Sequence, residues 1–157
     1  MQRIGRLPIS EQTLYAARFR PRCLADPPWG EEQFDCYVLN LGGDIAGQEM
    51  QEIAREVTEA RTDWVHTAGK GCELLHDAID RMSASIGRQA QAGDGSPMTS
   101  WDEEETTTEE MADLVLEAGL GGNTYHLVAL FVGPEDLCAA ALTAIRSRCN
   151  EDNREVQ

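Results

Sequence analysis

The stretch Tyr125–Val132, with the sequence YHLVALFV, decides the fold of this chain. Its last six residues are all apolar, as is typical of a strand buried on both faces of a sheet. Pro134 follows and opens a stretch with helical apolar spacing, since proline is favoured at the first position of a helix. We therefore expect a central strand followed by a helix that packs on one face of the sheet.

The same order of strand and helix occurs three more times before this stretch. Each expected strand is a short, mostly apolar run, and each expected helix has apolar residues at spacings of three and four. Repeated alternation of this kind implies parallel strands joined by crossover helices. The sequence predicts an α/β fold, a single-domain three-layer sandwich with a mostly parallel sheet of about four strands and helices on both faces. The other expected strands are Cys36–Leu41, Trp64–Thr67 and Met98–Trp101, and the expected helices run through Met50–Val57, Cys72–Ile86, Met111–Ala118 and Leu137–Ile145.

The chain has 157 residues, a length that fits one domain. Residues 1–34 are expected to form an N-terminal arm that packs on the body, because four prolines interrupt them and regular patterning starts only afterwards. Within the arm, a short helix or strand is expected around Thr13–Arg20. The α/β domain is expected over residues 35–149, and a flexible polar tail over residues 150–157.

The net charge narrows the classes of partner. The chain has 28 acidic and 13 basic residues, a formal net charge of −15, and a field of that sign repels nucleic acid and anionic lipid.

There is no apolar run long enough for a membrane span and no signal-peptide pattern at the N-terminus, so we expect a cytoplasmic protein. The five cysteines include no Cys-x-x-Cys pair, which favours reduced thiols over a disulfide scaffold or a zinc finger.

The densest charge lies in residues 102–117, which hold eight acids and no base. One interpretation is a solvated helix start that the helix dipole favours, and Thr107 with Glu110 has the spacing of a capping box. The other is a docking surface for a basic protein, with a tryptophan as its anchor. The expected partner-binding residues are Trp101, Asp102, Glu103, Glu104, Glu105, Glu109 and Glu110.

A second candidate site lies where the expected strands end. The glycine-rich loops Gly42–Gly47 and Gly69–Gly71 occupy positions where backbone amides could bind phosphate, but neither matches a nucleotide-binding motif. Beyond them, a cysteine, a histidine and an aspartate spaced four apart share one helix face, where they could bind a metal or simply border the core. The sequence contains no catalytic motif and indicates no cofactor. The candidate ligand or metal residues are Gly69, Lys70, Cys72, His76, Asp77 and Asp80.

Two short motifs carry a resemblance to a family. Gly69-x-x-Cys72 is followed by His76-Asp77 and by Asp80, and the second motif is Met98-Thr99-Ser100-Trp101 ahead of an acidic helix. With these motifs in this order, residues 35–132 resemble an uncharacterised family of small bacterial α/β proteins. The chain departs from the family pattern at Ala68 and Leu75, where tryptophans are common. The resemblance implies a bacterial, cytoplasmic single domain and no activity. It marks as positions to test Cys72, His76, Asp77, Asp80, Thr99 and Trp101. These residues meet in space if the second expected helix packs beside the third expected strand.

Two functions are weighed against each other. The first is an acidic cytoplasmic binding protein, an immunity or antitoxin-type inhibitor that blocks a basic toxin or nucleic-acid-binding effector through its acidic face. The second is a small-molecule or nucleotide-binding α/β module, with possible enzymatic activity, that uses the two glycine loops with Cys72, His76 and Asp80. The charge and the lack of a catalytic motif favour the first.

Overall fold

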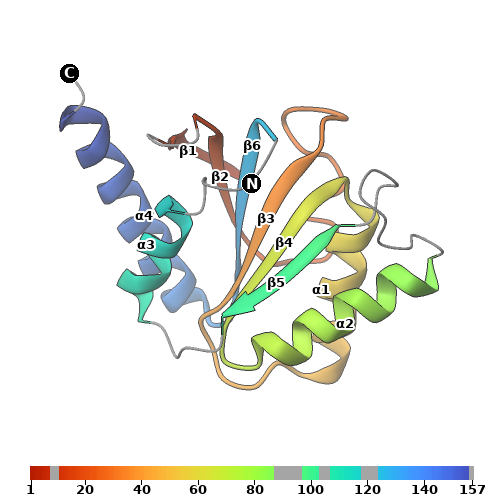
Figure 1. Cartoon of the computed structure of the whole chain (residues 1–157). Helices are drawn as coiled ribbons and strands as arrows, with labels where there is room; N and C mark the ends of the chain where they lie inside the picture. The colour runs from red at the N-terminus through yellow and green to blue at the C-terminus, as the bar shows by residue number, and fades with distance from the viewer. Residues whose placement is uncertain (8–10, 87–96, 103–106, 118–123, 156–157) are drawn as a thin grey trace.

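A single six-stranded sheet organises the chain, with the strand order β1-β2-β6-β3-β4-β5 (Figure 1). The computed structural model describes residues 1–7, 11–86, 97–102, 107–117 and 124–155. The strands are β1 (Gln2–Arg6), β2 (Thr13–Arg18), β3 (Phe34–Asn40), β4 (Thr62–Gly69), β5 (Met98–Asp102) and β6 (His126–Val132). The helices are α1 (Gly47–Glu59), α2 (Cys72–Ser85), α3 (Thr108–Glu117) and α4 (Glu135–Glu155).

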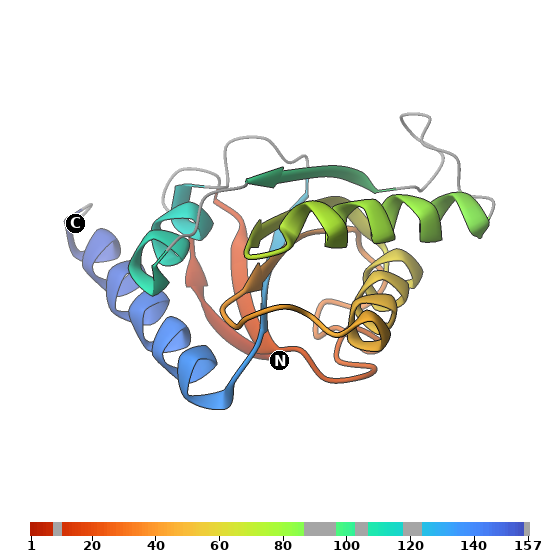
Figure 2. The same ribbon diagram turned by 90° about the horizontal axis from the view of Figure 1, so that it is seen from below.

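The sheet is mixed but mostly parallel, because five neighbouring strands run in one direction and only β1 is antiparallel to its neighbour β2. Helices α1 and α2 cover one face and α3 and α4 the other (Figure 2). The predicted α/β class with a mostly parallel sheet is confirmed. All five cysteines are free thiols. Of the helices in the described ranges, none combines the length and the apolar character that crossing a membrane requires.

The predicted number of strands was wrong, since the sheet has six strands and not about four. The two additional strands, β1 and β2, come from the segment that was assigned to an N-terminal arm. The element expected around Thr13–Arg20 is strand β2, and it pairs in parallel with β6 from Thr13↔His126 to Arg18↔Phe131. The sheet therefore includes residues from this segment.

The run of apolar residues in β6 separates two cores. Leu127, Ala129 and Phe131 pack with α3 and α4, whereas the alternate residues Val128 and Leu130 pack with α1 and α2. A strand buried on both faces needs apolar residues at every position, which explains the continuous run. The central position expected for β6 is confirmed.

Helix α3 has a capped start and an ion pair with α4. The predicted capping box is present: the Glu110 carboxylate accepts a hydrogen bond from the Thr107 amide at 2.7 Å, and Thr107 Oγ1 accepts one from the Glu110 amide at 3.3 Å. The hydrogen bonds that the Thr107 amide and hydroxyl donate to the carboxylate lower the pKa of Glu110. Arg148 of α4 forms an ion pair with Asp113 of α3. Helix α4 continues to Glu155, where the sequence indicated a polar tail from residue 150.

Candidate functional site

Strand β5 forms one edge of the sheet, and within the described ranges its only strand partner is β4. It is short, with the sequence MTSWD, and two of its large side chains are exposed. Met98 is 57% exposed and Trp101 is 43% exposed. Large exposed apolar side chains on an open strand edge are a feature of interaction sites.

Helix α2 supports this strand from one face of the sheet (Figure 2). The Trp101 ring lies on the nearly buried His76 ring, with the centroids 4.5 Å apart and the planes at 54°. Thr99 Oγ1 donates a hydrogen bond of 2.7 Å to Asp80 Oδ1. The alternation of the strand therefore directs Thr99 and Trp101 toward α2.

Two carboxylates flank the imidazole beneath Trp101. His76 Nδ1 lies 3.5 Å from Asp77 Oδ1, and His76 Nε2 lies 3.7 Å from Asp80 Oδ2. Both carboxylates are about half exposed, so they present negative charge to solvent beside the indole. We call the set Trp101, His76, Asp77, Asp80 and Met98 the β5 surface.

The His76, Asp77 and Asp80 side chains do not converge as metal ligands do. The two carboxylates approach opposite nitrogens of the same imidazole ring, whereas metal ligands converge on one point. Across the described ranges, no group of three or more His, Cys, Asp or Glu side chains is placed to hold a metal ion. The Cys72 thiol is buried and donates to the Asp102 carbonyl oxygen at 3.0 Å, so it links the start of α2 to the end of β5.

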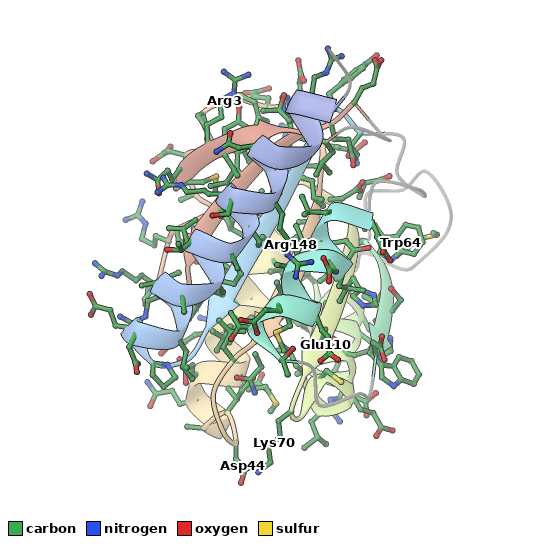
Figure 3. The ribbon with its side chains drawn as sticks, turned by 90° about the vertical axis from the view of Figure 1, so that its left-hand side faces the viewer. Arg3, Asp44, Trp64, Lys70, Glu110 and Arg148 are labelled. Atoms are coloured by element: carbon green, nitrogen blue, oxygen red, sulfur yellow. The ribbon has the colours of Figure 1, made fainter. Side chains whose placement is uncertain are left out.

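A second group of side chains lies on the opposite face of β5. Ser100 Oγ accepts a hydrogen bond from Trp64 Nε1 at 2.9 Å and lies 2.8 Å from His66 Nδ1. The Tyr37 and His66 ring centroids are 4.8 Å apart. Figure 3 shows Trp64 beyond α3, on the side away from α4. These residues were not among the predicted site residues, because only the strand register brings them together.

Burial makes His66 a pH-dependent element of this group. Desolvation lowers the pKa of His66 below its ordinary value, although the negative charge of Asp102 opposes the shift. The unfolded chain therefore binds more protons than the folded chain as the pH falls below about 6.5, and stability is lost in that window. We expect the advantage of the wild type over His66→Gln in free energy of unfolding to decrease from pH 7.5 to pH 5. Urea unfolding at each pH measures it, and a difference that does not change with pH would contradict the assignment.

The two glycine loops lie together at the carboxyl ends of β3 and β4, as the sequence predicts for a parallel pair. Asn40 joins them: its Nδ2 donates to the Gly43 and Lys70 carbonyl oxygens, and its Oδ1 accepts from the Gly42 amide. Lys70 Nζ lies 3.1 Å from Asp44 Oδ1, and Figure 3 shows these two side chains beside each other.

A depression of about 260 Å³ lies against these loops and the start of α3. Two groups that could bind an anion there already have partners, since the Gly42 amide donates to Asn40 Oδ1 and Lys70 forms an ion pair with Asp44. The fold itself explains a glycine at position 69, because its φ is +91° and a Cβ there would lie 2.2 Å from the Asn40 carbonyl oxygen. The contacts of these loops therefore favour a structural role.

The predicted acidic partner-binding set is divided between two places. Trp101 and Asp102 lie on β5, whereas the exposed Glu109 and Glu110 lie in the first turn of α3, on the other face of the sheet from α2. Glu103, Glu104 and Glu105 are outside the described residues. The imidazole against which Trp101 packs lies beside two acids of the other candidate set, Asp77 and Asp80.

Comparison with known proteins gives one family. The family model described as "Domain of unknown function (DUF7684)" matches residues 18–145. The chain belongs to this family. No curated protein and no solved structure shows a significant match. The predicted membership of an uncharacterised family is thereby confirmed, and the matched residues of this DUF7684 domain include both motifs that carried the resemblance.

In this DUF7684 domain the two motifs meet in space. The motif on α2 supplies His76, Asp77 and Asp80, and the motif on β5 supplies Thr99 and Trp101. Strands β1 and β2 lie almost entirely outside the matched residues, which begin at residue 18. The shared part of the fold thus includes the complete β5 surface.

Proposed function

We propose that this chain is an acidic binding protein that receives a basic protein partner at the β5 surface. The observation that carries the proposal is Trp101, an indole 43% exposed on an open edge strand and supported from below by His76. An exposed aromatic side chain that is already held in place loses little conformational entropy on binding. Trp101 is therefore suited to anchor a partner.

The charge around this anchor indicates the chemistry of the partner. Helix α2 carries three exposed acids, Glu73, Asp77 and Asp80, against one base, Arg81. The whole chain has a net charge of −15, which accelerates encounter with a basic protein and disfavours acidic ones. An indole face beside carboxylates also suits an arginine or lysine side chain through a cation–π contact.

Proteins that bind nucleic acid are commonly basic, because they neutralise phosphates. We therefore favour a toxin or effector of that kind as the partner, with this chain as its immunity or antitoxin-type inhibitor. A chain that covers the basic surface of such a protein would exclude its nucleic-acid substrate by competition for the same charges.

A charge-reversal experiment tests the proposal. Glu73→Lys with Asp77→Lys changes the net charge by +4 on exposed positions of α2, the helix that supports Trp101. Glu49→Lys with Glu59→Lys makes the same change on exposed positions of α1. Both double variants and the wild type are tagged and used for capture from an extract of the cells that make the protein, at low and at raised salt.

We expect the wild type and the α1 variant to retain one basic polypeptide in stoichiometric amount at low salt and to release it at raised salt. The α2 variant should retain at least about ten-fold less, because like charges then face the partner. Equal retention by both double variants, or no stoichiometric basic polypeptide on the wild type, would overturn the proposal.

A further inference from the structure

We propose that the basic partner binds by adding an extended segment to β5 as a seventh strand. This inference rests on the proposed function and specifies its binding mode. An edge strand offers main-chain N–H and C=O groups on its outer side, and an extended peptide can pair with them. β5 pairs with β4 from Trp64↔Met98 to Ala68↔Asp102, and its other edge faces no strand in the described ranges.

Among the described residues, the two edges of the sheet differ in the features that hinder strand addition. Strand β1 carries Arg3 and Arg6, and its pairing with β2 shifts register between Arg3 and Gly5. Charged residues and irregular pairing are the usual means by which proteins prevent unwanted strand addition. β5 has one charged residue, Asp102 at its end, and no lysine, arginine or proline, and its pairing with β4 has no shift in register.

The two faces of β5 define what an added strand would carry. Residues of an added strand alternate between the faces, as those of β5 do. On the α2 face they meet Trp101 and the carboxylates of Asp77 and Asp80, which suit basic side chains. On the other face they meet the exposed Met98 beside Trp64, its register partner on β4, which suits apolar side chains.

The segment predicted from these surroundings alternates basic and apolar residues. A second copy of this chain is a poor occupant, since each copy carries a net charge of −15 and like charges oppose close approach. Charge complementarity favours a basic segment from another protein, with its basic residues directed toward α2. The apolar residues of that segment then cover Met98.

The test uses the complete ¹⁵N-labelled chain and a synthetic ten-residue peptide that alternates lysine and valine. A glutamate–valine peptide of the same length is the charge control. Two further lysine–valine peptides carry backbone N-methyl groups, one on every valine and one on every lysine. An added strand presents only one of these two sets of N–H groups to β5, so one methylated peptide should fail and the other should bind.

We expect the lysine–valine peptide to slow amide exchange within Met98–Asp102 by at least ten-fold at low salt, and the glutamate–valine peptide to have no effect. Unchanged exchange in β5, or binding by both methylated peptides, would overturn strand addition. If both methylated peptides still shift the Trp101 signals of the wild type, and Trp101→Ala lowers the affinity for both peptides, the basic partner at the β5 surface stands while strand addition falls. If no peptide shifts Trp101, strand addition falls, and the charge-reversal capture decides the proposed function separately.

Discussion

Replacement of Gly69 by alanine is expected to lower the free energy of unfolding by about 3 kcal/mol or more. Gly69 has a φ of +91°, a region that costs a residue with a Cβ about 1–2 kcal/mol. A Cβ at this position would lie 2.2 Å from the Asn40 carbonyl oxygen and 2.9 Å from Met111 Cε. The methionine can move aside, but the carbonyl belongs to the backbone of β3, so the ends of β3 and β4 must separate. Urea unfolding measures the loss.

Gly71 provides the matched control two residues away. Its φ is +74°, but a Cβ there would have no heavy atom within 4 Å, so Gly71→Ala should cost only about 1 kcal/mol. Equal losses of unfolding free energy for the two variants would show that the positive φ alone destabilises them. The contact with Asn40 would then contribute nothing to the destabilisation. Because Gly69 was a candidate ligand residue, its unfolding curve must accompany any functional assay of Gly69→Ala.

Sequence patterns predicted the helices and strands whose apolar residues form a recognisable spacing within one short stretch of chain. The apolar run of β6 and the helical spacing of α1 and α2 each lie within one stretch, and these elements are present. Strand β2 has a weaker pattern, TLYAAR, because it becomes a strand of the sheet through pairing with β6 at the other end of the chain. Pairing over such a separation leaves no local signal, which is why the sheet was predicted with too few strands.

Two groupings of the candidate site followed from the sequence. The four-residue spacing placed His76 and Asp80 in one candidate site and the acidic stretch placed Trp101 in another, whereas the family motifs grouped all three on the condition that the second helix packs beside the third strand. Only the packing of α2 beneath β5 shows that the indole and the imidazole are in contact. The Trp64, His66 and Ser100 group needed the register of β4 against β5, and a shift of one residue would place these side chains on different faces.

Replacement of Trp101 by alanine is expected to weaken binding of the basic partner by at least about 30-fold, the equivalent of a 2 kcal/mol hot spot. The indole is the largest exposed side chain on the β5 surface, and it combines apolar area with a face that attracts cations. Loss of the indole also exposes the His76 ring, which the partner would then have to cover or leave hydrated in the complex. Titration calorimetry with the captured partner measures the change, and Trp101→Phe should recover part of the affinity.

Tyr125 provides the control, because it tests whether any exposed aromatic side chain contributes to binding or only Trp101. It is 78% exposed and precedes β6 at the opposite end of the strands, so Tyr125→Ala should leave affinity unchanged. Trp101→Ala should cost little folding stability, because much of its indole already faces solvent in the free protein. If Trp101→Ala instead caused a large loss of stability and left affinity unchanged, the role of Trp101 would be to cover His76 and to hold β5 against α2. In that case the exposed carboxylates beside it would have to supply the binding energy alone, which exposed charges seldom do.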